Sequence, residues 1–325
     1  MISSLAGKRC LVIGAGGFIG GHLCDELALA GAHVSAFGRR PRFPSSRMPD
    51  VWFEYDARNV EALRVALAGT DIVFHVLGSA DPTASNYNVS NALLETIAID
   101  GTIIDLCIAQ QVERLVFVSS GGTVYGPAQY LPIDERHPTN PLSAYGVAKL
   151  CVEKILQLQK QLVDMDYIIL RVANPYGPRQ DPHRGQGVVA KLLYRAMLNE
   201  PIDIWGDGSA VRDYIYISDL VRAIVAASTA KLSLERTFNI GSGTGRSVND
   251  IVTAAEMLLV RRVQRHHLSQ KSGMVSANVL DCSRAHAMLD WHPTIAWHDG
   301  LSQTLAWITG YYGPLEDRSR DEPVA

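Results

Sequence analysis

Short apolar runs alternate with longer amphipathic stretches through the first half of the chain. The runs are rich in Val, Ile, Leu and Phe and end at glycine or polar residues, which is typical of strands buried on both faces. The longer stretches carry apolar residues at helical spacing. Strands are predicted at 9–13, 33–37, 71–76, 115–118 and 167–170, and helices at 18–30, 59–68, 91–110 and 144–162. This order predicts an α/β fold with a doubly wound parallel sheet, covered by helices on both faces.

The alternation ends near residue 174, after which helices mix with short strands and glycine-rich turns. Helices are predicted here at 186–199, 218–230 and 248–259. We therefore expect one domain over 1–173 and a smaller α/β domain, mainly over 174–313, with segments that return to the first. The charged residues 314–325 are expected to form a flexible tail.

Composition and charge narrow the class of protein. The chain has 325 residues, of which 47% are hydrophobic and 19% charged, as expected for a globular protein. A net charge of -3 argues against a globally basic nucleic-acid binder. No apolar run approaches the roughly 18 residues of a membrane span, so no membrane association is expected. Five widely spaced cysteines without a CxxC pair favour a reducing, cytoplasmic location.

A glycine-rich loop, GAGGFIG, follows the first predicted strand and opens a helix. In this pattern Gly14 permits a tight turn, Gly17 lets the backbone approach a pyrophosphate, and Gly20 lets the helix pack on the strand. The helix would begin at Phe18 and Ile19, so its N-terminus would face the anion. The context predicts a Rossmann-type site for a nicotinamide dinucleotide, with a glycine-rich turn that binds nothing as the alternative.

The residues after the second strand bear on the choice of cofactor. An acidic residue is expected there for the ribose 2′-hydroxyl of NAD, but the sequence has Arg39 and Arg40. Two arginines suit the 2′-phosphate of NADP, unless they form only a solvated basic turn. Asp56 is a candidate for the adenine edge, or simply a helix-entry residue.

Tyr145 and Lys149 stand four residues apart and share one face of a predicted helix, which Ser143 is expected to cap. A free tyrosine has a pKa near 10, and a cation one turn away favours the phenolate. Upstream, a buried strand ends in the loop SSGGTVYG at 119–126, and ligands of parallel sheets sit at the carboxyl ends of strands. This arrangement predicts a tyrosine that moves a proton at a hydroxyl group while hydride leaves the same carbon.

These motifs together resemble the extended short-chain dehydrogenase/reductases, and within them the nucleotide-sugar epimerase/dehydratase group of the UDP-glucose 4-epimerase type. The resemblance runs over nearly the whole chain. It also includes RVANPYG at 171–177, GDG at 206–208, VRDYI at 211–215 and FNIGSG at 238–243. It implies an NAD(P)-dependent epimerase of a nucleotide-diphosphate sugar that passes through oxidation at C4. It also implies a homodimer, formed through the helices predicted at 91–110 and 144–162.

The resemblance implies a role for each matching residue. Tyr145 would be the catalytic acid and base, and Lys149 would bind the nicotinamide ribose and lower the pKa of the tyrosine. Asn174 and Arg212 would contact the nucleotide diphosphate, and Tyr214 in the same motif is a further substrate-binding candidate.

Two of the candidate phosphate-binding residues have alternative interpretations. Arg212 matches phosphate oxygens chemically, but a structural pair with Asp213 or Asp219 is the other interpretation. The family often has a phosphate-binding arginine shortly before the strand expected at 277–281. Here Lys271 is at best its replacement, and lysine provides a point charge where arginine provides a fork.

The sequence also departs from the family at the position of the catalytic hydroxyl group. Gly121 stands where many epimerases have a catalytic Ser or Thr. Thr123 or Ser120 could supply the hydroxyl instead, and we favour Thr123 because residues two apart on an extended chain point the same way.

The same residues help to decide between the epimerase and other functions in this family. A 4,6-dehydratase is disfavoured, because Gly122 and Thr123 stand where family dehydratases have an Asp-Glu pair. An NADPH-dependent 4-keto-sugar reductase remains an alternative that Arg39 and Arg40 favour, whereas the family resemblance favours NAD. A non-catalytic NADP(H)-binding sensor or scaffold is the third hypothesis. The histidines suggest no metal site.

Overall fold

The computed structural model describes residues 5–43, 46–78, 89–231, 234–269 and 275–313. Its centre is a seven-stranded sheet in the order β10-β6-β5-β4-β1-β2-β3, with every neighbouring pair parallel. The strands are β1 (Arg9–Ile13), β2 (His33–Phe37), β3 (Val51–Phe53), β4 (Ile72–His75), β5 (Arg114–Ser120), β6 (Tyr167–Val172) and β10 (Thr237–Ile240). The predicted α/β class with a doubly wound parallel sheet is confirmed.

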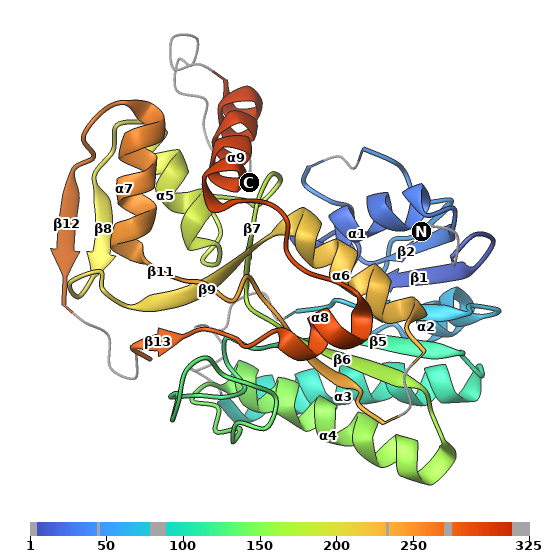
Figure 1. The fold of residues 1–325 in the computed structure, drawn as a ribbon. Coiled ribbons are helices and arrows are strands. Elements are labelled where there is room, and N and C mark those ends of the chain that lie inside the picture. The colour runs from blue at the N-terminus through green and yellow to red at the C-terminus, as the bar shows by residue number, and fades with distance from the viewer. Residues whose placement is uncertain (1–4, 44–45, 79–88, 232–233, 270–274, 314–325) are drawn as a thin grey trace.

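Alternation along the strands produces two cores, one on each face of the sheet. In β1, Cys10 and Val12 pack into one core while Leu11 and Ile13 pack into the other, because successive strand residues point to opposite faces. The helices α1 (Phe18–Leu29) and α6 (Ile217–Thr229) cover the first face. The helices α2 (Val60–Leu67), α3 (Val89–Ala109) and α4 (Ala144–Val163) cover the second. Figure 1 shows this three-layer arrangement.

The second half of the chain builds a smaller α/β unit. Its main sheet contains β7 (Asn174–Tyr176), β9 (Val211–Tyr216), β11 (Gly245–Ser247) and β13 (Ala277–Asn278), and β8 (Ile202–Trp205) pairs separately with β12 (Arg265–Leu268). Its helices are α5 (Val188–Met197), α7 (Val248–Leu259), α8 (Ser283–Leu289) and α9 (Trp297–Tyr312). Two segments of this half belong to the first layer system: β10 is the edge strand of the first sheet, beside β6, and α6 packs on the face of that sheet, as Figure 1 shows for α6.

Local signals in the sequence account for several element ends. Ser143 caps α4, and its hydroxyl accepts the Gly146 N–H at 3.1 Å, as predicted. The helix α9 was not predicted, because its sequence combines aromatic residues with Gly300 and Gly310 and has weak helix propensity. Packing on α5 and α7 compensates for this. Within the described ranges, no helix has both the length and the apolar character to cross a membrane.

Candidate active site

The glycine loop between β1 and α1 forms a close-packed cradle. Gly14 has a φ of +94°, which side chains rarely permit. A Cβ on Gly20 would lie 2.3 Å from the Gly14 carbonyl oxygen, and one on Gly16 would lie 1.8 Å from the Arg39 carbonyl oxygen. Gly17 is the N-cap of α1 and makes no side-chain cap, and the first turn from Phe18 carries no acidic residue. Sequence reasoning did not single out Gly16, although GAGG contains it.

The first turn of α1 therefore suits a phosphate group. An uncapped helix N-terminus presents free N–H groups and a positive dipole end to an anion. Gly17, Phe18, Ile19 and Gly20 supply this end, and a side chain at Gly20 would push into the backbone of the loop. These residues fit the pyrophosphate of a dinucleotide.

The two arginines after β2 differ in their surroundings. Arg40 pairs with Glu54 at 3.2 Å, and its guanidinium lies 4.9 Å from the centre of the Trp52 ring. Arg39 is exposed, and its charge helps to lower the pKa of Asp56. Asp56 accepts two hydrogen bonds from the Arg58 guanidinium, at 2.8 and 3.0 Å, and this pairing is the main reason why its pKa falls to about 2. Of the two arginines, Arg39 has the freer side chain for a 2′-phosphate.

Tyr145 and Lys149 lie on one face of α4, at the carboxyl ends of β4 and β5. The Lys149 ammonium donates hydrogen bonds to the carbonyl oxygens of Leu77 at 3.0 Å and Val118 at 3.1 Å. It lies 5.9 Å from the centre of the Tyr145 ring and is almost completely buried. Because Leu77 follows β4 and Val118 lies near the end of β5, the carboxyl-terminal parts of the two strands fix the position of the lysine.

The electrostatics of this pair differ from the expectation. Burial lowers the pKa of Lys149, although the carboxylates of Asp100 and Glu153 act against this effect. Burial and the Asp100 carboxylate raise the pKa of Tyr145 to about 12. The expected lowering of the tyrosine pKa by Lys149 is therefore not found in the protein itself, because desolvation dominates at both groups.

The conformation of the loop after β5 differs from the one assumed in the choice between the Thr123 and Ser120 hydroxyls. Residues 121–123 form a turn, so the extended geometry assumed for Thr123 is wrong. The Thr123 hydroxyl is nevertheless buried and has no hydrogen-bond partner among the residues that the structure describes. Ser120 ends β5, and its hydroxyl lies 3.9 Å from a Cβ built on Gly122. A buried hydroxyl without a partner is unusual, which keeps Thr123 as the preferred candidate.

Steric contacts explain why position 121 is a glycine. A Cβ there would lie 2.6 Å from the Leu280 side chain and 2.9 Å from the Arg171 carbonyl oxygen. The amide of Asn278 also donates to the Gly121 carbonyl oxygen at 3.0 Å. The loop thus packs against the chain beside β13, and neither Ser nor Thr fits at this position without a shift.

The candidate substrate residues meet at β7, β9 and β13. Asn174 stands opposite Tyr214 in register, and its amide donates to the Asp213 carbonyl oxygen at 3.0 Å. The Arg212 guanidinium donates to the Val211 carbonyl oxygen at 2.8 Å, and burial lowers its pKa. Lys271 lies outside the described residues.

The alternative role of Arg212 as half of an ion pair is not found. Asp213 accepts hydrogen bonds from Ser242, Gly243 and Leu280. Asp219 binds Arg222, Thr294 and Ile295. Within the described part of the chain, Arg212 has no carboxylate partner, so a partly buried cation lies in this region without a counter-charge. Such a cation suits an anionic ligand.

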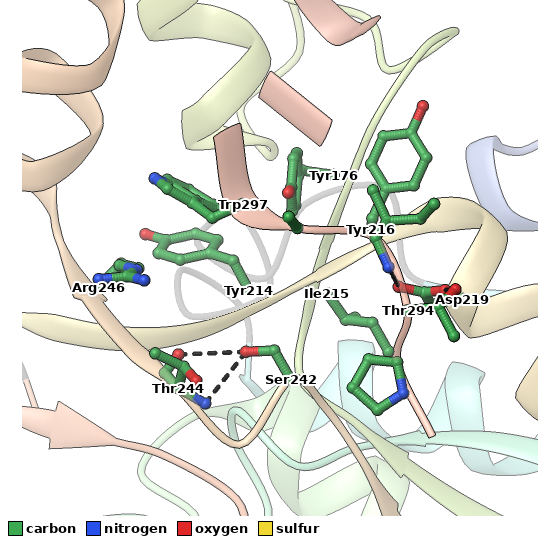
Figure 2. Close-up of a pocket in the computed structure, with 13 residues that line it drawn as sticks. Tyr176, Tyr214, Ile215, Tyr216, Asp219, Ser242, Thr244, Arg246, Thr294 and Trp297 are labelled. Atoms are coloured by element: carbon green, nitrogen blue, oxygen red, sulfur yellow. Dashed lines mark hydrogen bonds between the residues drawn. The ribbon is translucent and has the colours of Figure 1, made fainter. Parts of the chain in front are cut away.

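An aromatic pocket of about 290 Å³ is lined by Tyr214, Trp297 and Arg246. Figure 2 shows Tyr214 next to Trp297, with ring centres 5.8 Å apart, and Arg246 beside them. Arg246 stands opposite Arg212 in the β11–β9 pairing. Of the substrate candidates that the structure describes, only Tyr214 lines this pocket. The catalytic candidates Tyr145, Lys149 and Thr123 do not line it.

A buried polar network under the site was missed by sequence reasoning. Glu153, one turn after Lys149, accepts a hydrogen bond from Ser119 and forms an ion pair with Arg171 at 2.6 Å. Arg171 also donates to the hydroxyl of Tyr125 at 3.0 Å. The spacing of Glu153 from Lys149 was the available signal, because residues four apart share a helix face. The network fixes α4 against β5 and β6.

Comparison with known proteins agrees with this geometry. The NAD dependent epimerase/dehydratase family matches residues 10–241. The UDP-glucose 4-epimerase of Mycolicibacterium smegmatis is 32% identical over 311 residues, which cover 92% of this chain and 98% of that protein. The solved structure of Thermotoga maritima UDP-glucose 4-epimerase with UDP-glucose is 29% identical, with a TM-score of 0.88, and the match covers 94% of this chain and 100% of that one. The Thermus thermophilus UDP-glucose 4-epimerase in complex with NAD is 27% identical, with a TM-score of 0.85, and the match covers 93% and 99% of the two chains. This chain belongs to the NAD-dependent epimerase/dehydratase family.

Proposed function

We propose that this protein is an NAD-dependent 4-epimerase of a UDP-linked sugar. The observation that carries the proposal is the meeting of Tyr145, Lys149 and the loop of Ser120 and Thr123 at the carboxyl ends of β4 and β5. The similarity to UDP-glucose 4-epimerases over more than nine tenths of the chain supports it.

Each residue would have a distinct task in the reaction. When bound, NAD supplies a reversible hydride acceptor for the sugar C4. The Tyr145 phenolic oxygen would take the proton from the 4-hydroxyl group and later return it. The Thr123 hydroxyl would donate a hydrogen bond to the same oxygen, and Lys149 would hold the ribose hydroxyls of the cofactor. Arg212, which has no carboxylate partner among the described residues, and the Asn174 amide would bind the diphosphate, because a guanidinium matches phosphate oxygens.

Purification and turnover test the proposal together. We expect the purified protein to retain NAD, identified by absorbance and mass, and to interconvert UDP-glucose and UDP-galactose. Both sugars should reach the same equilibrium mixture from either side, without added cofactor. Failure to epimerise any UDP-hexose while the protein retains NAD would contradict the proposal.

The exposed Arg39 favours a second candidate, an NADPH-dependent 4-keto-sugar reductase. In that case the protein would be purified without cofactor, would bind NADPH more tightly than NADH, and would consume it stoichiometrically. Replacing Arg39 with Asp should then weaken NADPH binding and leave NADH binding unchanged. A protein that binds NADP(H) and converts no nucleotide sugar would support the sensor hypothesis instead.

We also propose that the protein is a homodimer formed through α3 and α4. These helices pack side by side, and Leu94, Leu158 and Leu162 on them are 67%, 51% and 66% exposed. Light scattering should report a dimer, and the double change Leu158→Asp and Leu162→Asp should give a monomer. The control is Met257→Asp on α7, which is also well exposed and should leave the dimer intact. A wild-type monomer contradicts the proposal.

The free cysteines are compatible with a reducing, cytoplasmic location.

A further inference from the structure

His75 and Asp100 form a buried pair that the reaction above does not use. The His75 Nε2 atom lies 2.9 Å from the Asp100 Oδ1 atom, and the two side chains are 0% and 3% exposed. His75 is the last residue of β4, and Asp100 lies in the middle of α3 among apolar residues. Burial of a carboxylate is strongly unfavourable unless charges or hydrogen bonds compensate it. The pair therefore needs a reason for its position.

The pair adjoins Lys149. Leu77, two residues beyond His75, accepts a hydrogen bond from the lysine ammonium at 3.0 Å. The rings of His75 and Phe117 meet edge to face, with centres 5.3 Å apart. The Lys149 ammonium lies 4.5 Å from the centre of the same Phe117 ring. The end of β4 thus holds the histidine and the contact to the lysine within one short segment.

Two carboxylates act on Lys149, but one of them is already neutralised. Glu153 of α4 is bound by the Arg171 guanidinium of β6 through two nitrogens and by the Ser119 hydroxyl. The second carboxylate is Asp100, whose partner on β4 is an imidazole. Tyr145 of α4 is a further titratable group of the described site, and the charge of Asp100 raises its pKa.

The hydrogen bonds of the pair leave one atom of each side chain without a partner among the described residues. The Nδ1 atom of His75 is buried and has no hydrogen-bond partner among the described residues. The Oδ2 atom of Asp100 is likewise buried without a described partner, so this carboxylate is hydrogen-bonded through one oxygen, whereas Glu153 accepts from Ser119 and Arg171. Asp100 is thus the less compensated of the two carboxylates near Lys149.

We propose that Asp100 is a positioning residue whose carboxylate, oriented by His75, is the counter-charge that keeps Lys149 a cation at the active site. This inference rests on the proposed function. Burial lowers the pKa of Lys149 and the Asp100 charge raises it, so loss of this charge leaves the lysine more easily neutralised. The same charge raises the pKa of Tyr145, so both groups should titrate at lower pH without it.

The test is Asp100→Asn, compared with Asp105→Asn on the exposed side of the same helix. We expect the bell-shaped pH profile of kcat to move toward acid by on the order of one unit in the first variant. The KM for the sugar nucleotide should stay the same, and Asp105→Asn should follow the wild type. A variant that loses activity equally at every pH would show a merely structural role and overturn the inference.

A second readout is independent of sugar turnover. The tyrosinate absorbance of Tyr145 can be isolated by subtracting the spectrum of Tyr145→Phe in each background, with and without NAD. It should develop at lower pH in Asp100→Asn than in the wild type. If the absorbance curve shifts in a protein that converts no UDP-sugar, the role of Asp100 is supported and the proposed function is rejected. If the enzyme is active and its absorbance curve does not shift, the proposed function is supported and the role of Asp100 is rejected.

Changes at His75 separate orientation from folding. His75→Gln keeps an N–H donor at similar reach and should retain the wild-type profile. His75→Leu removes the donor and should move the profile or prevent folding, which thermal unfolding would report. An unchanged profile in a folded His75→Leu protein would contradict the orienting role of the histidine.

Discussion

Burial disfavours the charged forms of both Tyr145 and Lys149. The pKa of the tyrosine is raised to about 12 and that of the lysine is lowered, each mainly by desolvation. The proton transfer that we propose needs the phenolate, so the positive charge of the nicotinamide has to favour it. Cofactor binding is therefore expected to be a condition for an ionised tyrosine as well as for hydride transfer.

Tyr145→Phe removes the proposed proton carrier while keeping the ring. We expect kcat to fall by about 10²–10⁴-fold, because general acid–base catalysis contributes that much. NAD binding, followed by fluorescence or mass, should be unchanged. Tyr130→Phe at an exposed position is the control and should keep full turnover. Full activity in Tyr145→Phe would remove the tyrosine from the mechanism.

Thr123→Val replaces the buried, unpartnered hydroxyl with a methyl group of the same shape. We expect a loss in kcat of about tenfold or more, because one hydrogen bond to the reacting oxygen is lost. Ser120→Ala should have a smaller effect. The opposite order of the two variants in a steady-state assay would assign the role to Ser120.

At the scale of elements, the contact between the glycine loop and α1 tightly constrains the backbone near the cofactor site. Gly20→Ala places a methyl group 2.3 Å from the Gly14 carbonyl oxygen. We expect a destabilisation of about 1–3 kcal/mol in urea unfolding and weaker NAD binding. Gly101→Ala on α3 is a matched control, because nothing lies within 4 Å of a Cβ there. It should be neutral or stabilising, since alanine has the higher helix propensity.

Most elements of the first half could be predicted from the sequence because each has a local cause, whereas the three-residue strand β3 was not among the predicted ranges. Continuous apolar runs indicate buried parallel strands, and Ser143 marks the start of α4 through its side chain. The helix α9 lacks such a signal, since packing by Trp297 and its neighbours stabilises it more than propensity does.

The candidate site could be predicted only in part. Motif spacing identified Tyr145 and Lys149, but not the fact that the lysine binds the carbonyls of Leu77 and Val118. His75 and Asp100 are 25 positions apart, and only the packing of α3 on the sheet brings them together. Sequence patterns do not contain such long-range contacts.

At the scale of the molecule, α1 connects the two halves. The His22 Nε2–H group donates to the Pro178 carbonyl oxygen at 2.8 Å, and the Nδ1 atom accepts from Arg179 at 2.6 Å. Arg179 also pairs with Asp25 at 2.8 Å. Burial and the Arg179 charge lower the pKa of His22 from 6.5 to about 4. The native contact therefore requires the neutral ring.

This contact predicts a loss of stability in acid. Between pH 6.5 and about 4 the unfolded histidine binds a proton that the folded one does not, so stability falls as the pH decreases through this window. The full contribution is up to about 3 kcal/mol. His22→Gln keeps a neutral donor and should lose less stability than the wild type between pH 7 and pH 4.5 in urea titrations. Parallel losses in both proteins would contradict this role.

The position of β10 at the edge of the central sheet also sets the order in which the chain can fold during synthesis. β6 is buried along all six residues, and its outer backbone groups pair with β10, which begins at Thr237. Until residue 240 has left the ribosome, the nascent sheet has an open, apolar edge of the kind that recruits other chains. A message truncated after the catalytic motifs would therefore encode an aggregation-prone product. The central sheet is therefore completed by a strand that is translated long after Lys149.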